Sequence, residues 1–438
     1  MVTSAILIIF MIIITVKILF DIYYLGVSKK FVNEKCNINI TKKVDILLII
    51  PVLREQSIIE STLDHFLNMK LDNIRLHACI AGTSRECNGR EMNYISTGCV
   101  VETWIKNNEK KFSDDLIFSY AEAIDENGDR ATQLNYAVKQ ASKLFVPDVV
   151  GVYDADSLPD IFTLEEVASE YCCNSNTVFQ QPVHFINSAN RMANQGKNPI
   201  LVANALYQTT WTAIRELPRW KSHSKYNEKN GKRSYLRNDY LIGHGEFMPF
   251  KIYEKYIFPE REVTDGIQLG YRVSMSGVSI KPLHTFCIDD VPKSVGQIIG
   301  QHKRWFGGCN RLWSAYKWSK NNCGQSSVFQ MIDGYWSQLS WTYASLYAII
   351  SLILSIVKAI NGNSLFLIIM LIELFIYCYL IPFVSNNLIP EKIKIRVIDW
   401  LCLPLAIGIK GIGPNIYLIQ KMISIFRKKE IKYSKVER

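Results

Sequence analysis

Long apolar segments divide the chain into regions with different patterns of apolar and polar positions. Residues 4–25 are almost wholly apolar, and 336–357 and 365–384 are two further apolar windows, the last with a single charged residue, Glu373. Each window has about the 20 residues that an α-helix needs to cross a bilayer. We therefore predict transmembrane helices at these three places. A carboxylate inside a span indicates a transport pathway or a hydrogen bond between helices, and both interpretations of Glu373 stay open.

A fourth apolar stretch, 397–418, differs from the three windows because it contains Asp399, Pro404, Lys410 and Pro414. Broken backbone at membrane depth is tolerated only where it is buried in protein or lines a cavity. We therefore predict a re-entrant or interfacial segment here rather than a fourth span.

Between residues 40 and 290, strand-like and helix-like stretches alternate. VDILLIIPV, IRLHACIAG, DLIFSYAEA and VVGVY are apolar and strand-like, whereas SIIESTLDHFLNM and ATQLNYAVKQAS repeat apolar residues at helical spacing. This alternation predicts an α/β fold with a mostly parallel, Rossmann-like sheet between helices. Ligands bind beyond the C-terminal strand ends of such sheets, and Pro51, Gly82 and Asp154 lie at such ends.

Beyond residue 160 the pattern is less regular. TVFQQPV and VSIKPL predict short strands, and residues 198–215 predict a helix. EVTDGIQLGYRVSMSG predicts a helix to about Met275, and YLIGHGEFMPF predicts a strand broken by glycines.

The net charge of +10 is placed beside the apolar windows. Lysines follow the first window at 29, 30, 35, 42 and 43, basic residues follow the third at 392, 394 and 396, and a basic tail, 427–438, closes the chain. This positive-inside bias predicts a multi-pass plasma-membrane protein whose region from about 28 to 330, and whose tail, are cytosolic. The placement favours membrane lipid over nucleic acid as a partner. No basic region precedes the first window and no cleavage site follows it, which argues against a signal peptide.

The 438 residues suffice for a large catalytic domain plus membrane segments. Eleven cysteines are scattered along the chain without a Cys-x-x-Cys pair. This spacing argues against a zinc site or a disulfide framework, and reduced thiols fit a cytosolic domain.

Two carboxylates, Asp154 and Asp156, follow the apolar run Val149–Tyr153. Alternate residues of an extended chain point the same way, so both would project from the C-terminal end of this strand. Like charges placed together are costly unless a cation lies between them, and a divalent metal that carries a diphosphate would serve. The alternative is a solvated turn that caps the helix beginning near Ile161.

Residues 291–330 are predicted to form interfacial helices. Gln301, Arg304 and Trp305 fall at i, i+3 and i+4 of a helix and therefore on one face. They fit a helix on the membrane surface, where Arg and Trp are common. They also fit ligand binding, because a guanidinium offers a fork of donors to phosphate oxygens and an indole offers a flat face to a sugar or base.

Two further residues also have a structural and a functional interpretation. Asp265 in PEREVTDG begins a predicted helix, where Asp often caps, and it is also a candidate general base for an acceptor hydroxyl, with Glu262 in reserve. His244, in GHGEFMPF, either contacts an acceptor or satisfies a buried turn.

In this order, ahead of membrane helices, these motifs resemble the family 2 membrane glycosyltransferases, which include the cellulose, chitin and hyaluronan synthases and the ceramide glucosyltransferases. The resemblance rests on Asp154-x-Asp156, Thr264-Asp265 and Gln301-x-x-Arg304-Trp305. Over roughly residues 44–310 it also covers Pro51-x-x-x-Glu55, GDRATQLNYA with Arg130 and Asn135, and Asp289–Ser294.

The resemblance implies an inverting glycosyltransferase with a GT-A fold in a cytosolic domain at 40–290. A nucleotide-sugar donor, a UDP-sugar by default, would bind through Mg2+ or Mn2+ held by Asp154 and Asp156. Asp265 would be the base, with Trp305 and His244 at the acceptor. The other donor and diphosphate contacts would come from Pro51, Glu55, Arg130, Gln301 and Arg304.

Two departures from the family pattern affect particular assignments. Many members carry Thr-Glu-Asp where this chain has TDG, so an ungapped alignment puts Asp265 at the Glu and Gly266 at the catalytic Asp. If the alignment instead contains one inserted residue, Asp265 falls at the position of the catalytic Asp. IAGTSRE stands where many members carry Asp-Asp-Gly-Ser to hold the base, so uracil recognition has no direct support.

The preferred product is a growing β-linked polysaccharide of the cell surface or capsule. The alternative is a single addition that makes a glycolipid or lipid-linked sugar. Because of Gly266, a third interpretation is an inactive membrane scaffold or partner subunit. A nucleotidyltransferase also uses paired aspartates, but it does not require Gln301-x-x-Arg304-Trp305 before membrane helices.

Overall fold

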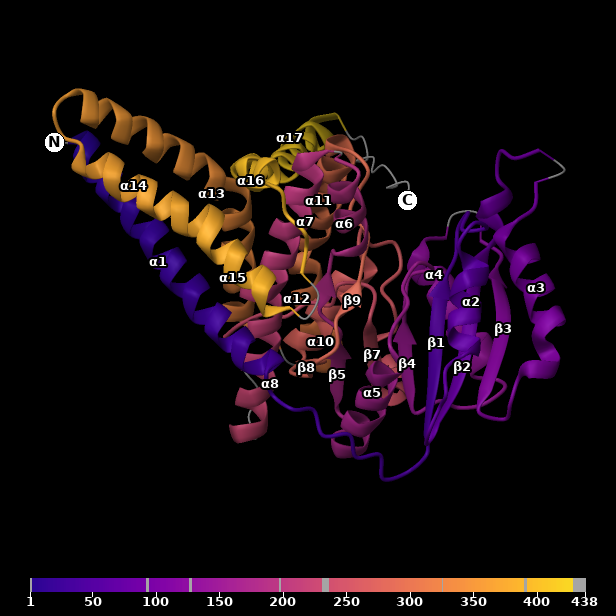
Figure 1. The fold of residues 1–438 in the computed structure, drawn as a ribbon. Helices are drawn as coiled ribbons and strands as arrows, with labels where there is room; N and C mark the ends of the chain where they lie inside the picture. The colour runs from indigo at the N-terminus through magenta and orange to yellow at the C-terminus, as the bar shows by residue number, and fades with distance from the viewer. Residues whose placement is uncertain are drawn as a thin grey trace.

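The structure is a computed structural model that describes residues 2–91, 94–125, 128–196, 198–230, 236–324, 326–389 and 392–427. Within these residues, one sheet has the strand order β3-β2-β1-β4-β7-β5-β8, and long apolar helices lie beyond its β8 side (Figure 1). The strand bounds are β1 Val44–Pro51, β2 Ile74–Thr83, β3 Leu116–Ala123, β4 Val149–Val152, β5 Thr177–Gln180, β7 Glu246–Pro249 and β8 Ser279–Pro282. A separate pair consists of β6 Val183–His184 and β9 Cys287–Ile288.

Most neighbours in the large sheet are parallel, as predicted. β1 pairs in parallel with β2 and β4, β2 with β3, and β5 with β8, whereas β7 is antiparallel to both β4 and β5. The segments VDILLIIPV, IRLHACIAG and DLIFSYAEA form β1, β2 and β3. In YLIGHGEFMPF only the last part is a strand, because Gly243 and Gly245 have φ of +93° and +58° and interrupt the extended backbone.

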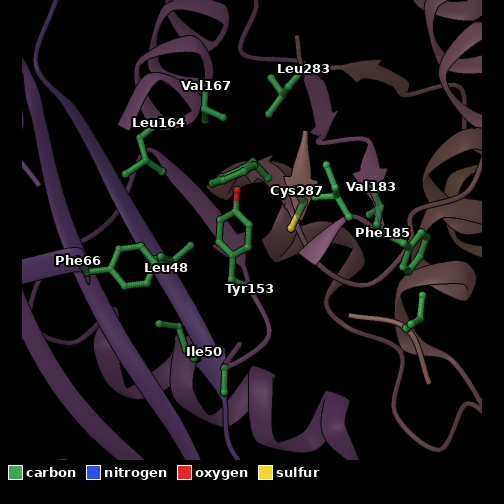
Figure 2. Close-up of a cluster of buried hydrophobic side chains, with 14 of the residues drawn as sticks. Leu48, Ile50, Phe66, Tyr153, Leu164, Val167, Val183, Phe185, Leu283 and Cys287 are labelled. Carbon is green, nitrogen blue, oxygen red and sulfur yellow. The ribbon is translucent and has the colours of Figure 1, made fainter. Parts of the chain in front are cut away.

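The two faces of the sheet are covered by different helices. Alternate residues of β1 point to opposite faces, so Leu48 and Ile50 enter one buried cluster, whereas Leu47 and Ile49 enter the other. Figure 2 shows Leu48 and Ile50 on the same face as Phe66 of α2. Side chains of α4 fill the opposite face.

The helices of the sheet region connect and cover these strands. The helix predicted to end near Met275 is α10, and the helix predicted at 198–215 is α7, which continues through a π-helical turn, η3, into α8. Their bounds are α2 Ile59–Leu67, α3 Thr97–Asn108, α4 Arg130–Ala141, α5 Ile161–Cys173, α6 Asn187–Asn194, α7 Pro199–Trp211, η3 Thr212–Glu216, α8 Leu217–Asn230, α9 Phe250–Tyr256, α10 Asp265–Met275, α11 Val295–Cys309 and α12 Leu312–Cys323.

Four helical stretches among the described residues are long and apolar enough to cross a membrane: Ser4–Val32, Val328–Ile360, Leu365–Leu388 and Val397–Arg427. They correspond to α1 (Val2–Val32), α13 (Val328–Ile360), α14 to α15 (Leu365–Phe375, with η4 Ile376–Leu380, and Ile381–Leu388), and α16 with α17 (Val397–Ile409, Ile412–Arg427). In Figure 1, α1, α13 and α14 lie side by side and project away from the sheet.

These apolar helices expose many large hydrophobic side chains. Leu19 and Ile12 on α1 are 60% and 56% exposed, and α13 and α14 expose similar residues. A continuous apolar surface of this kind fits contact with lipid. Glu373 accepts a hydrogen bond from Thr15 of α1, which agrees with one of its two interpretations, a hydrogen bond between helices.

The last apolar segment is divided near Gly411 into α16 and α17, and Pro404 lies inside α16. A re-entrant or interfacial path for 397–418 stays a prediction, as do the limits of the spans at 4–25, 336–357 and 365–384 and the interfacial position of 291–330. From residue 428 on, the basic tail predicted at 427–438 lies outside the described residues.

Replacing Leu48 with Ala tests the packing of the sheet. Leu48 has no exposed surface, so its truncation leaves a cavity and is expected to cost about 2–5 kcal/mol of unfolding free energy. Ile124, just after β3, is 86% exposed, and Ile124→Ala is expected to change it by less than about 0.5 kcal/mol. Thermal unfolding of the purified proteins in detergent measures both, and equal midpoints would contradict the described core.

Candidate active site

The candidate site begins where β4 ends at the carboxyl edge of the sheet. Buried and half-buried residues alternate from Tyr153 to Ser157, so that the side chains of Asp154 and Asp156 are both partly exposed while their neighbours are buried. The backbone turns here, since the Ser157 N–H donates to the Asp154 carbonyl at 3.0 Å. Both carboxylates thus lie at the edge where open α/β sheets bind ligands.

Arg130 joins the residues predicted for donor binding and for catalysis. It is the first residue of α4, whose start is fixed by a capping box between Asp129 and Thr132. Its Nη1 donates to Asp265 Oδ2 at 2.6 Å, and its Nη2 donates to Asp154 Oδ1 at 3.2 Å and to the Gly243 carbonyl at 2.6 Å. One guanidinium therefore links residues from α4, the end of β4, α10 and the loop before β7.

These neighbours keep the guanidinium of Arg130 positively charged. Burial acts to lower the pKa of Arg130, but the carboxylates, first that of Asp265 and then that of Asp154, raise it above its ordinary value. The paired carboxylates in turn face a permanent positive charge.

Asp265 lies at the start of α10, but Thr264, not Asp265, occupies the N-cap position, and the Asp265 carboxylate bonds to Arg130. Capping alone therefore does not account for Asp265. The next residue, Gly266, has no room for a side chain, because a Cβ there would lie 2.5 Å from the Gly243 backbone. An aspartate at position 266 would clash, so Asp265 is the carboxylate of this segment that enters the site.

Glu246, the first residue of β7, is a site residue that the sequence motifs did not indicate. It has no exposed surface, and burial first, then Asp265, raises its pKa to about 8, against lowering by Arg130 and by the nearby Gly243 backbone. A carboxylate inside an otherwise apolar strand was the available signal. Asp154 and Asp265 outnumber the single guanidinium of Arg130 even while Glu246 holds its proton, and such oxygen donors suit a divalent cation.

Glu262, the reserve candidate for the base, and Asn135, the counterpart of an asparagine in the family pattern, contact other residues. Glu262 accepts from Arg311 Nη1 at 2.9 Å and lies 3.6 Å from Arg272 Nη2. Asn135 donates to the Phe258 carbonyl at 2.9 Å and accepts from the Phe258 N–H at 3.0 Å, so it braces the segment after α9.

Pro51 and Glu55 lie at the same carboxyl edge, at the end of β1 and before α2. The Glu55 backbone N–H donates to Thr97 Oγ1 at 3.0 Å, which holds this turn against α3. Their predicted part in donor binding stays a prediction.

Gln301, Arg304 and Trp305 lie on α11, as the sequence predicted. Gln301 accepts from Gln208 of α7 at 3.3 Å, and Trp305 lines a cavity of about 140 Å3 that Gln208 also lines. Trp305 thus lines the cavity and Gln301 bonds to a residue of its wall, whereas Asp154 and Asp265 meet at Arg130.

The cavity lies between the sheet region and the apolar helices, because its walls come from α7, η3, α8, α10, α11 and α13 together with Lys410. Its lining is rich in aromatic rings: Phe185, Tyr207, Trp211, Tyr240, Tyr271, Trp305 and Trp341. His244 and Asp289 complete one part of the wall. His244 therefore faces a space that a ligand can enter.

Several polar atoms on this wall are buried without a hydrogen-bond partner among the described residues. They are both amide atoms of Asn238, Oε1 of Gln208 and both ring nitrogens of His302. Burial, with Lys410 in addition, lowers the pKa of His302 to about 3, so its imidazole is neutral. Buried polar atoms are normally paired, and these groups therefore indicate a hydrogen-bonding ligand or water.

Comparison with solved structures supports the fold. PcManGT, a mannosyltransferase from Pyrobaculum calidifontis solved in complex with GDP-Man and Mn2+, matches with a TM-score of 0.54 and 13% identity over 95% of this chain and 99% of that chain. TarS from S. aureus in complex with UDP-GlcNAc matches with a TM-score of 0.39 and 11% identity over 89% and 94%, a score too low to carry an inference. No protein-family model and no curated protein sequence matches the chain.

The chain therefore has a mostly parallel α/β sheet that resembles those of GT-A glycosyltransferases, with helices apolar enough to span a membrane in its N- and C-terminal regions. The predicted fold class is confirmed. At 13% identity the likeness shows the fold alone, so membership of the family 2 synthases stays a prediction.

Glu246→Gln tests the buried carboxyl through the pH dependence of stability. The folded protein holds a proton on Glu246 up to about pH 8, whereas the unfolded chain releases it at the ordinary, lower pKa, so the native carboxyl loses stability as pH rises. Without added metal, we expect similar thermal midpoints for variant and native protein near about pH 5, and an advantage on the order of 1–3 kcal/mol for the variant near about pH 9. Glu254→Gln, at an exposed position on α9, should show no such pH dependence. A difference that is the same at both pH values would contradict the assignment.

Proposed function

We propose that this chain is an integral-membrane, inverting glycosyltransferase that moves a sugar from a nucleotide-diphosphate donor to the end of a growing polysaccharide. Its catalytic domain would face the cytosol at the plasma membrane, as the placement of basic residues predicts. The observation that carries the proposal is the Arg130 link between Asp154 and Asp265 at the carboxyl edge of a GT-A-like sheet.

Asp154 and Asp156 would hold Mg2+ or Mn2+, which neutralises the donor diphosphate when bound. The surplus of carboxylates around Arg130 supports a cation at this place. The related fold of PcManGT was solved with GDP-Man and Mn2+, which supports a nucleotide-sugar donor here without fixing the base. A UDP-sugar remains the default, and Pro51, Glu55, Gln301 and Arg304 are the further donor contacts that we assign.

Asp265 would act as general base. The acceptor oxygen attacks the anomeric carbon as the bond from that carbon to the diphosphate oxygen breaks, and the hydroxyl proton passes to the Asp265 carboxylate. Arg130 holds this carboxylate in position before the transfer through its hydrogen bond to Oδ2. Attack on the face opposite the leaving group converts an α-linked donor into a β-linked product.

The cavity beside α11 would bind the acceptor, with Trp305 and His244 on its wall. Aromatic faces and unpaired polar atoms in one cavity suit a sugar, which offers both apolar ring faces and hydroxyl groups. A lipid tail would leave the amide of Asn238 and the ring nitrogens of His302 unsatisfied. This supports a polysaccharide end over a hydrocarbon chain as the occupant.

The double variant Asp154→Asn/Asp156→Asn tests donor binding. Purified membranes receive a panel of nucleotide sugars with Mg2+ or Mn2+, and released nucleoside diphosphate is measured with the size of the product. We expect release with one sugar, a ladder of products, and loss of release in the double variant by at least about 100-fold. Asp148→Asn, at the opposite end of β4 beside Lys42, should keep release. A single discrete lipid product would favour the glycolipid alternative, and no release from folded native protein would favour a scaffold.

Asp265→Asn tests the base separately. We expect turnover to fall by about 10²- to 10⁴-fold while the donor dissociation constant changes little, because the carboxylate acts on the acceptor hydroxyl. Glu262→Gln is the matched control, since that carboxylate is bonded to Arg311 rather than Arg130. Near-normal turnover in Asp265→Asn, or its loss in Glu262→Gln, would overturn the assignment.

A further inference from the structure

Three side chains with nitrogen, sulfur and oxygen donors meet beside the cavity, and two of them, His244 and Asp289, line its wall. His244 comes from the loop before β7, Cys287 from β9, and Asp289 follows β9. One ligand atom from each lies within 4.8 Å of the other two. These segments are far apart in sequence and meet only in the fold.

The backbone around this trio is held in place. Gln180 Nε2 donates to the His244 carbonyl at 2.9 Å, and the Asp289 N–H donates to the His184 carbonyl at 2.9 Å. Cys287 pairs with Val183 in the small sheet and belongs to the buried cluster around Tyr153 (Figure 2). His244 and Asp289 thus lie in loop segments whose backbone is tied to β5 and β6 by hydrogen bonds, and Cys287 lies in β9.

The contact between His244 and Asp289 is close but is not a hydrogen bond. His244 Nε2 lies 3.2 Å from Asp289 Oδ2, yet Nε2 has no hydrogen-bond partner among the described residues, and the other Asp289 oxygen, Oδ1, is likewise buried without one. Two ligands of one tetrahedral Zn2+, with bonds of about 2.0–2.1 Å, are about 3.3 Å apart. The separation of the pair therefore matches that of two ligands of one ion.

The chemical types of the donors select the metal. Mg2+ prefers six oxygen ligands, whereas a set of imidazole, thiolate and carboxylate suits Zn2+ and related transition-metal ions. Three protein ligands and a fourth, open position are the arrangement of a zinc site that admits water or substrate.

The electrostatic surroundings also favour a cation. Cys287 is buried and lies close to the carboxylate of Asp289. A bound metal ion would offset the negative charge of that carboxylate and deprotonate the thiol.

We propose that His244, Cys287 and Asp289 bind one divalent transition-metal ion of the zinc type, at a site distinct from the Asp154–Asp156 pair. The ion would occupy the cavity wall and leave one coordination position toward the cavity. This inference rests on the ligand set and does not depend on glycosyl transfer.

A second group with similar residue types provides the control. Cys36, Glu166 and His284 also lie within 4.8 Å of one another, but there Glu166 already accepts from His284 Nδ1 at 2.6 Å and from the His284 N–H at 2.9 Å and 3.0 Å. The Glu166 carboxylate and His284 Nδ1 are bonded to each other, although His284 Nε2 is buried without a partner among the described residues. The carboxylate of this group is therefore already engaged, unlike Oδ1 of Asp289.

The test is a titration of the purified, detergent-solubilised full chain with Co2+, which replaces Zn2+ and gives a thiolate-to-cobalt absorption in the near ultraviolet. We expect this absorption in the native protein at about one Co2+ per chain, and its displacement by added Zn2+. Cys287→Ser should abolish it, and Asp289→Asn should weaken Co2+ binding by about 10-fold or more. Cys36→Ser and the double variant Asp154→Asn/Asp156→Asn should both retain it.

Melting temperatures in the presence of a chelator show whether each variant is folded, and Asp289→Asn keeps the thiol if Cys287→Ser unfolds. Absence of the absorption in the native protein, its survival in Cys287→Ser, or its loss in Cys36→Ser would each overturn the proposal. If Co2+ binds as expected and no sugar transfer is found, the proposed function is wrong and the metal site still stands.

Discussion

The guanidinium of Arg130 holds the candidate site together. It bonds to Asp265 at the start of α10, to Asp154 beyond β4 and to the Gly243 carbonyl, so three separate segments depend on one side chain. Without it, buried carboxylates would face one another with no fixed positive charge between them. Burial first, and then the charge of Asp265, raises the pKa of Glu246, while Asp154 and Asp265 place two carboxylates against the one guanidinium of Arg130. A site with unbalanced charge of one sign is prepared for a cation or a positively charged transition state.

Much of the sheet could be predicted from the sequence, because its parallel strands are buried on both faces and appear as apolar runs such as VDILLIIPV. The strand at 246–249 was harder to delimit, since two glycines with positive φ precede it and only the backbone shows where extension resumes. The Asp-x-Asp pair and the α11 residues were visible from local spacing alone. Whether Asp265 or position 266 supplies the carboxylate was not, because that choice depends on the approach of Gly243, far away in sequence.

The cavity and its lining could not be predicted from residue spacing either, because the lining residues are far apart in sequence and meet only in the fold. Its lining combines α7, α10, α11 and α13, and no local pattern states that Trp211 and Trp341 share one space. Glu246 was overlooked because a single charged residue in a short strand is equally compatible with exposure to solvent. Cysteine spacing likewise reports only ligands that are near one another in the chain, whereas His244 and Cys287 come from different elements.

The short Gly243–Gly245 segment cannot change in length without moving the groups that bind its two ends. Its first residue is held by Arg130, and its last donates to the Val152 carbonyl at 2.8 Å and accepts from the Gln181 N–H at 2.7 Å. Insertions or deletions would displace either Arg130 or the start of β7. The side chain between the two glycines faces the cavity and is not bound by the same constraint. Exchange of that residue would therefore change the cavity wall and remove a proposed metal ligand, while the backbone that aligns the charged groups stays unchanged.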